Sequence, residues 1–305
     1  MPATTADLQP DLPPQASTAA TPPPRFWADL TTADFAALDL ARTIAILPLG
    51  ATEQHGPHLP LSVDTVLADG IVAACLPHLP PEVPALFLPT QRVGYSPEHA
   101  AFAGTLTLKA DTAIRLWTDM AESVRASGVN KLVLFNTHGG HVGLMDVVAR
   151  DLRARLGMLV YSVSWFNLPL TDEAGHDVNA LFAPEEHRFG IHAGDIETSM
   201  MLALTPEHVR MPAAQHFAST SQVRARQFDV LGNGRSAKLA WQTQDYNPWG
   251  AVGNAAAATP AKGQALVQAA GRALARLLTQ VDQLPPDTLT QRTAYSGAEP
   301  GPSGL

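Results

Sequence analysis

The amino-acid sequence predicts an α/β fold, a single domain with a central, mostly parallel sheet flanked by helices. Short apolar runs alternate with longer segments of helical periodicity throughout residues 25–283. The short runs are apolar at nearly every position, which is typical of parallel strands that are covered on both faces. The chain has 305 residues, of which 46% are hydrophobic, so it can bury a large core.

The first half of the fold follows in chain order. A continuous apolar run (TIAILPL) predicts a buried strand at 43–49, and a helix at 63–76 follows it. A shorter apolar run predicts a strand at 85–89. The segment 110–127 is predicted to be a helix because its apolar residues recur at helical spacing, and Gly128 is a typical helix stop.

The second half repeats this alternation. KLVLF predicts a buried strand at 131–135, and a helix at 142–156 ends before a glycine. A further strand is expected at 158–165 and a helix at 196–204. A long closing helix is expected at 261–281. Ligands of such folds bind beyond the carboxyl ends of the strands, so polar residues just after the strands are the first candidates for a site.

The two ends of the chain differ from this core. Residues 1–24 are rich in Pro, Ala and Thr, and residues 284–305 have a similar composition. Neither segment carries enough large apolar side chains to fold, so both are predicted to be disordered tails. The first tail lacks the basic start and apolar centre of a secretory signal.

Composition excludes several partners. The formal net charge is −8 and no basic cluster is present, which argues against nucleic acid and anionic membranes. No apolar stretch approaches the roughly 18 residues of a membrane span. Cys75 is the single cysteine, so no disulfide can form within the chain, which favours a cytoplasmic location. Because Cys75 lies in an apolar helical run, we expect a buried structural role.

The first polar island follows the strand at 43–49. Glu53 and His55 lie two residues apart, so on an extended segment they face the same side and can reach one metal ion or two adjacent ones. Asp64 begins the next helix, where it can cap the helix or bridge two metals. Neutral imidazole and carboxylate suit hydrolytic divalent ions such as Zn, Mn or Fe.

The second island, Asn136-Thr137-His138-Gly139-Gly140-His141, follows KLVLF. Its glycines allow a positive φ or a close backbone approach to a ligand. His138 is nearest the strand and is the better candidate for a metal ligand. His141 can contact substrate or lie behind the site, and Asn136 can orient the loop or bind substrate.

The third island is His192-Ala193-Gly194-Asp195-Ile196-Glu197, just before an apolar helix. Asp195 is a plausible cap for that helix. Glu197 can complement the helix dipole, or it can serve a second metal position beside a loop histidine. His192 can cap the helix or act in catalysis.

These islands resemble the creatininase (creatinine amidohydrolase) family. The resemblance rests on TEQHGPHLPLSVDT, the His138-Gly-Gly loop, HAGDIETS, and the segment Gly94-Tyr95-Ser96-Pro97-Glu98-His99 leading to Phe102-Ala103-Gly104-Thr105. It covers about residues 25–283 and implies an α/β fold, two divalent metal ions per subunit and a homo-oligomer, commonly a hexamer.

The resemblance also implies roles for individual residues. Glu53 and His138 would hold one metal, His55 the other, and Asp64 would bridge them. His192 would be the catalytic histidine, and Glu197 would be the remaining carboxylate at the second metal. The candidate substrate contacts are Ser96, His99, Asn136 and Trp165.

Four departures from the family pattern bear on the substrate and together argue against creatinine itself. Gly139-Gly140 stand where creatininase has Tyr-Glu, whose Glu binds the second metal, and Glu197 is the candidate replacement. Trp165 can match one of the two tryptophans that hold creatinine, but the other falls near Arg188. The family's Glu-His pair is Ile191-His192 here, and its Phe-Pro-Gly-Thr is Phe102-Ala103-Gly104-Thr105.

We therefore expect a metal-dependent amidohydrolase that cleaves a cyclic or linear C–N amide bond with hydroxide held between two cations. His192 would pass a proton to the leaving nitrogen. Relatives that clip a short peptide or hydrolyse formamides in cofactor synthesis are the alternative within the family. A metal-binding scaffold without catalysis is the alternative outside the enzymes. Residues 231–234 (LGNG) are expected to form a loop, either a lid or an oligomer contact.

Overall fold

A computed structural model describes residues 23–291, 293 and 295. Its main sheet is four-stranded and parallel throughout, in the order β2-β1-β3-β4. The strands are β1 (Ile44–Leu49), β2 (Ala85–Phe87), β3 (Lys131–Asn136) and β4 (Leu159–Ser164). Each predicted strand is present, and the α/β fold with a parallel sheet is confirmed.

The predicted helices are also present, with ends that differ by at most one residue. They are α2 (Val63–Cys75), α3 (Ala110–Ala126), α4 (Val142–Leu156), α6 (Asp195–Leu204) and α9 (Pro260–Asp282). Gly157 ends α4 in a left-handed conformation with φ 66°, as its position after the apolar periodicity suggested. Sequence periodicity did not reveal four shorter helices, namely α1 (Thr32–Ala36), α5 (Pro184–Phe189), α7 (Thr220–Gln227) and α8 (Thr243–Tyr246).

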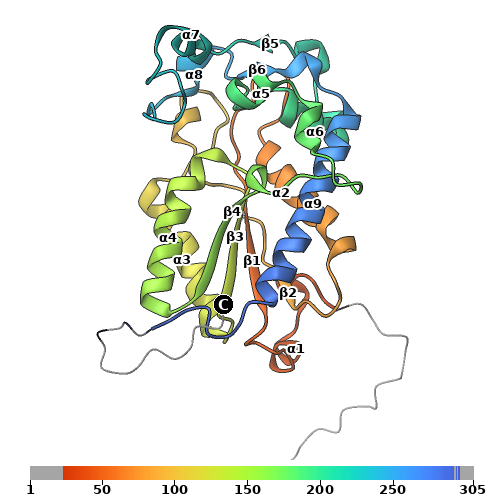
Figure 1. Cartoon of the computed structure of the whole chain (residues 1–305), viewed down its shortest axis with the longest axis vertical. Coiled ribbons are helices and arrows are strands. Elements are labelled where there is room, and N and C mark those ends of the chain that lie inside the picture. Colours follow the sequence, from red (N-terminus) through yellow and green to blue (C-terminus); the bar gives the residue numbers. More distant parts are fainter. Residues whose placement is uncertain (1–22, 292, 294, 296–305) are drawn as a thin grey trace, which may run out of the picture.

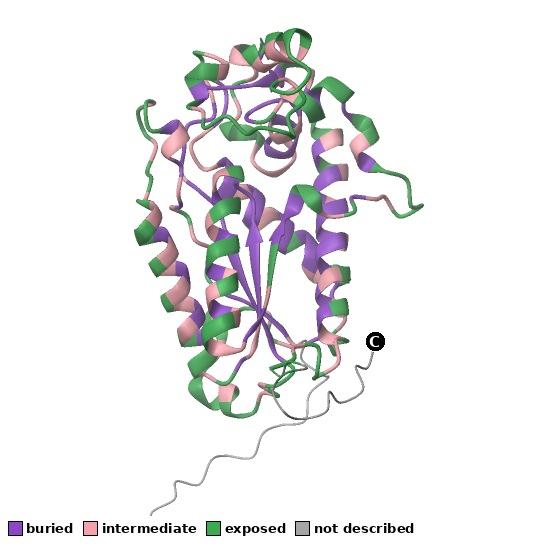
Figure 2. Cartoon of the chain, turned by 60° about the vertical axis from the view of Figure 1, so that its left-hand side comes forward, coloured by how far each residue is buried: buried purple, intermediate pink, exposed green. Residues whose placement is uncertain are grey.

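Two hydrophobic clusters lie on opposite faces of the sheet, because successive side chains of a strand point to opposite sides. Ile44 and Ile46 of β1 pack with α2 and α9, whereas Ala45 and Leu47 pack with α3 and α4. Figure 1 shows these helix pairs on the two sides of the sheet, and Figure 2 shows the strands buried between them. Every residue of β1 is buried, which explains why its sequence is apolar throughout.

The strand order contains a reversal between β1 and β3. The chain passes from β1 through α2 to β2 on one side, and then through α3 to β3 on the other side. The loops after β1 and β3 therefore diverge to opposite faces and leave a crevice at the carboxyl edge, which is where ligands bind in such sheets. Glu53 follows β1 and His138 follows β3, so the reversal brings these two side chains together.

A small upper region covers this edge of the sheet. It contains α5, α7, α8 and a two-stranded antiparallel sheet of β5 (His216–Phe217) and β6 (Gly253–Asn254). Figure 1 shows these elements gathered beyond the carboxyl ends of the strands. An isolated bridge between His192 and Val252 ties the third polar island to this region.

Several whole-chain predictions can be compared with the described residues. Of the tails predicted at 1–24 and 284–305, residues 1–22, 292, 294 and 296–305 lie outside the described residues. Leu284 and Leu289 are partly buried against the core. Burial raises the pKa of the Cys75 thiol to about 12, which fits its structural role. Within the described part of the chain, no helix combines the length and hydropathy needed to cross a membrane.

Candidate active site

The loop after β1 presents two buried side chains with defined chemistry. His55 is fully buried, and its Nδ1–H donates to the Glu53 carbonyl oxygen at 3.0 Å. This bond leaves the Nε2 lone pair free, and Nε2 has no hydrogen-bond partner among the described residues. Burial, and then His192, hold the pKa of His55 well below its usual range. His55 is therefore neutral and oriented as metal-binding histidines are.

Asp64 lies in the first turn of α2 and is 1% exposed. Its Oδ2 accepts no hydrogen bond from any described residue, so this oxygen does not serve as a helix cap. Burial, and then the Glu53 carboxylate, raise the pKa of Asp64 well above its usual range. A second carboxylate in the same buried space is unfavourable unless a cation is bound there.

His138 faces these carboxylates from the loop after β3. Its Nε2 lies 3.1 Å from the Tyr95 carbonyl oxygen, which can only accept, so Nε2 carries the proton. Nδ1 lies 3.2 Å from Glu53 Oε1 and 3.7 Å from Asp64 Oδ2. Burial opposes protonation of His138, but Glu53, Glu98 and Asp64 together outweigh it and raise the pKa of His138 well above its usual range. A metal ion and a proton would compete for Nδ1.

Glu197 reaches the same centre from α6. Its Oε2 accepts a hydrogen bond from the Ala193 backbone at 2.5 Å and lies 3.9 Å from His55 Nε2. Ala193 has φ 55°, a left-handed conformation that a non-glycine residue adopts at a cost. His192 and Glu197, on either side of this turn, both approach His55.

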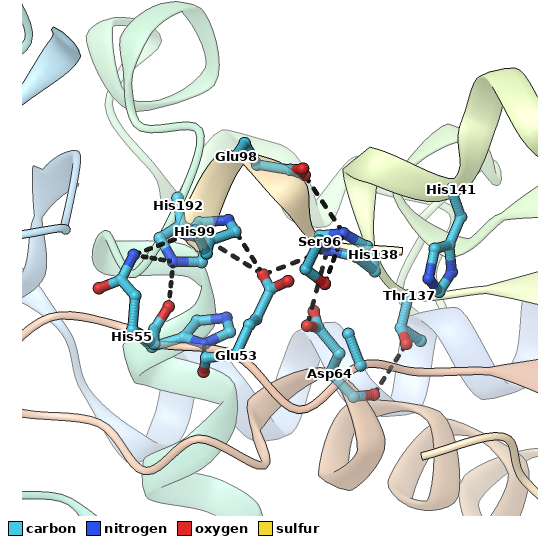
Figure 3. Close-up of polar contacts among 12 residues, drawn as sticks. Glu53, His55, Asp64, Ser96, Glu98, His99, Thr137, His138, His141 and His192 are labelled. Carbon is cyan, nitrogen blue, oxygen red and sulfur yellow. Dashed lines mark hydrogen bonds and ion pairs between the residues drawn. The ribbon is translucent and has the colours of Figure 1, made fainter. Parts of the chain in front are cut away.

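Together these side chains form overlapping sets that could each hold a metal ion. Within a set, the ligand atoms all lie within 4.8 Å of one another. The sets are Glu53 with Asp64 and His138, His55 with Asp64 and Glu197, and Glu53 with His55 and His192. Asp64 belongs to two of the sets, and Figure 3 shows its carboxylate beside Glu53 and His138.

The donor atoms fit divalent cations. Both oxygens of Glu53, Oδ2 of Asp64 and Nε2 of His55 are buried and accept no hydrogen bond from the described residues. Unsatisfied polar atoms at this depth are costly, and several at one point indicate a ligand that satisfies them together. Carboxylate oxygens with imidazole nitrogens are the donors that Zn and Mn accept.

His192 is held between two other imidazoles. Its ring centroid lies 4.1 Å from that of His55 and 4.2 Å from that of His99. The Nε2–H of His192 donates to the Gln54 carbonyl oxygen at 2.7 Å, which leaves Nδ1 facing the centre, 3.9 Å from Glu53 Oε1. His192 is 6% exposed and lines the cavity described below.

His99, like His138, lies against the Glu53 carboxylate. Gln54 Nε2 donates to His99 Nδ1 at 2.7 Å, so the His99 proton lies on Nε2, which is 3.2 Å from Glu53 Oε1. Burial, and then His192, lower the pKa of His99, so the ring is neutral. His99 also lines the cavity, which is consistent with a substrate contact.

The other predicted substrate contacts lie behind the site. Asn136 is fully buried, and its side chain bonds the His138 backbone at both of its ends. His141 accepts from the Tyr95 backbone and donates to Asn136 Oδ1, so it orients the loop. Ser96 and Trp165 are buried and are not among the residues that line the cavity; Trp165 packs in the core instead.

Sequence reasoning missed Glu98. Its Oε1 lies 3.3 Å from His138 Nε2, its side chain is 12% exposed, and it lines the cavity. A Cβ on Gly140 would overlap Glu98 Oε1 and His138 Nε2, whereas Gly139 has open space around it. Neither glycine has a positive φ. Gly140 is therefore needed because the Glu98 and His138 side chains approach its backbone closely. In the sequence, the only signal for Glu98 was its place in the segment Gly94–His99.

We predict that Gly140→Ala destabilises the protein by about 1–3 kcal/mol, because the added methyl group must displace His138 or Glu98. Gly139→Ala is the matched control and should change stability little. Denaturant unfolding of the two variants measures the difference. Equal stability of the two variants would contradict the close packing at Gly140.

A cavity of about 1270 Å³ opens from the metal-binding sets toward the upper region. Asp64, His138, His192 and Glu197 lie among its lining residues. Further lining comes from the segment of Glu98 and His99, from the loop after β3 and the start of α4, and from Ile191. The rest belongs to α5, α7, α8 and the loop between α7 and α8, which contains the predicted LGNG loop. This position fits a lid over the site.

The fold and the site define a creatininase-type hydrolase scaffold, and comparisons with known proteins agree. The family model described as creatinine amidohydrolase (creatininase) matches residues 28–278. The chain belongs to the creatininase family.

Individual relatives differ in activity. Over 171 residues the chain is 34% identical to a mycofactocin precursor peptide peptidase of Mycobacterium tuberculosis, covering 54% of this chain and 60% of the relative. It is 30% identical over 178 residues to a creatinine amidohydrolase of Pseudomonas putida, covering 54% and 66%. A solved creatininase structure is 26% identical with a TM-score of 0.65, covering 85% of this chain and 98% of that one. The matched part thus spans about three fifths of the peptidase.

Proposed function

We propose that this protein is a metal-dependent amidohydrolase that cleaves a C–N amide bond. The observation that carries the proposal is the pair of metal-binding sets that share Asp64, with buried donor atoms left unsatisfied. Glu53 and His138 would hold one cation with Asp64, and His55 and Glu197 would hold the other. Family membership supports the reaction class.

Bound divalent cations would supply Lewis acidity and would lower the pKa of a bound water. The chain's own residues supply orientation and proton transfer. His99 Nε2 lies 3.2 Å from Glu53 Oε1, and the Glu53 carbonyl oxygen accepts the hydrogen bond that orients His55. His192 Nε2–H donates to the Gln54 carbonyl oxygen, so Nδ1 is the atom that would exchange a proton with the leaving nitrogen of the substrate.

The choice of metal follows from donor type. Three carboxylates and two imidazoles favour Zn, Mn or Fe over the soft ions that prefer thiolate. Solved creatininases include a Zn-Zn form and a Mn form. We therefore expect two ions per subunit, zinc or manganese first.

Elemental analysis of the purified protein, followed by an ammonia- or amine-release screen over lactams, formamides and short peptides, tests this proposal. We expect about two divalent ions per chain, and release that a chelator abolishes and added Zn or Mn restores. Tight metal binding without release from any of these compounds would favour the scaffold alternative instead.

The family also suggests the state of the protein in the cell. We propose a cytoplasmic homo-oligomer, commonly a hexamer in this family. The single cysteine is buried, which is consistent with a reducing compartment. Light scattering of the full chain measures the mass, and a monomer at micromolar concentration would contradict the oligomer.

A further inference from the structure

The outer half of the cavity is basic, although the chain as a whole carries a net charge of −8. The carboxylates in its lining, namely Asp64, Glu98 and Glu197, lie at the end that contains the metal-binding sets. The basic residues of the remaining described lining are His187, Arg188, Arg224, Arg235 and Lys238. An anionic group of a substrate would therefore be attracted to the outer half.

Arg224 is the most firmly placed of these cations. It lies on α7, and its Nη1 donates to Thr220 Oγ1 at 3.2 Å. Its guanidinium lies 5.0 Å from the centre of the Tyr246 ring, a cation–π arrangement. The Thr220 hydroxyl in turn donates to the Asp245 carbonyl oxygen, which ties α7 to α8. The guanidinium is thus held in place before any ligand arrives.

Arg224 lines the cavity, and its Nη2 has no hydrogen-bond partner of good geometry among the described residues, although the guanidinium also interacts with the Tyr246 hydroxyl. A buried guanidinium N–H without an acceptor is costly, and none of the carboxylates in the described cavity lining lies in this half. A carboxylate accepts two parallel bonds from one guanidinium, which is the geometry that Arg binds best.

The neighbours of Arg224 indicate what the carboxylate is attached to. Trp241 and Tyr246 also line the cavity, and their ring centroids lie 5.0 Å apart. They offer an apolar surface next to the cation. The cavity volume of about 1270 Å³ exceeds the usual 300–1,000 Å³ of a small-ligand pocket.

We infer that Arg224 binds a carboxylate of the substrate, and that the substrate is an extended amide with an apolar or aromatic group beside that carboxylate. This inference rests on the proposed function for the amide, but the recognition itself does not require hydrolysis. The carboxylate is either the C-terminal group of a peptide or an acidic side chain.

The test measures binding to protein from which metal has been removed, so the result does not depend on turnover. The probes are N-acetyl-Ala-Ala-Phe as the free acid and as the C-terminal amide, each titrated calorimetrically. A second pair, the C-terminal amides of N-acetyl-Ala-Glu-Phe and N-acetyl-Ala-Gln-Phe, distinguishes a side-chain carboxylate from a terminal one.

We expect an acid to bind more tightly than its neutral counterpart in one of the two pairs, and Arg224→Gln to remove about 10- to 100-fold of that preference. Arg224→Lys should restore part of it. Arg226→Gln is the matched control, because Arg226 is an exposed arginine of the same helix that is not among the cavity-lining residues.

Three results would overturn the inference. They are equal binding of acid and neutral peptide in both pairs, no binding of any probe, or a preference that survives Arg224→Gln. The proposed function can fail separately. It fails if metal-loaded protein releases no amine or ammonia from lactams, formamides or short peptides, while the acid probe still binds more tightly than its neutral counterpart and this preference still depends on Arg224.

Discussion

Asp64→Asn is expected to abolish both metal binding and turnover. Asparagine has nearly the same shape but lacks the charge that two cations would share, and Asp64 belongs to both of the sets it would bridge. We expect the metal content to fall from about two ions per chain, and kcat/KM to fall by more than the 10- to 100-fold that follows loss of groups behind a metal ligand. Elemental analysis and amine release measure the two effects.

The same variant has a second signature in stability. In metal-free protein the Asp64 carboxylate is buried beside Glu53, so its pKa is raised and its charge is unfavourable. Metal-free Asp64→Asn should therefore melt at or above the temperature of metal-free wild type. Added Zn or Mn should raise the melting temperature of the wild type but not that of the variant.

Asp69→Asn provides the matched control on the same helix. Asp69 pairs with Arg92 and its side chain is 43% exposed, so the change should leave metal content and turnover nearly unaltered. Full activity and normal metal content in Asp64→Asn would show that Asp64 does not bridge the cations.

His192→Ala is expected to keep both metal ions and to lose about 10²- to 10⁴-fold in rate, the usual range for a general acid–base group. The reason is that Nδ1 faces the centre while Nε2 is bound to a backbone carbonyl. His176→Ala is the control, because His176 is an exposed histidine outside the described cavity lining and should have little effect.

This variant also decides between two roles of His192. Glu53, His55 and His192 form one of the possible metal-binding sets. If His192→Ala loses a metal ion together with activity, His192 is a ligand and another group carries the proton. A solvent isotope effect on kcat that is the same in wild type and variant would also contradict proton transfer by His192.

Much of the fold could be predicted because its strands and long helices have strong local patterns. The apolar run of β1 and the periodicity of α3 are visible without any structure, and the fold they imply is confirmed. The convergence of Glu53 and His138 also follows from their positions after adjacent parallel strands. Their roles as metal ligands stay predictions.

Other features depend on contacts between distant segments and leave little local signal. His192 packs against His99, 93 positions earlier in the sequence, and this contact follows from the upper region rather than from either motif. The helices α7 and α8 are short and weakly apolar, so sequence did not place Arg224 in the cavity. Glu98 was quoted within a motif, but its role depends on the packing above Gly140.

The most direct test of the proposed centre is an anomalous difference map from a crystal of the full chain grown with Mn or Zn. We predict two separate peaks, one beside Glu53 and His138 and one beside His55 and Glu197, with the carboxylate of Asp64 between them. A single peak, or peaks away from Asp64, would contradict the shared centre and the hydrolytic function built on it.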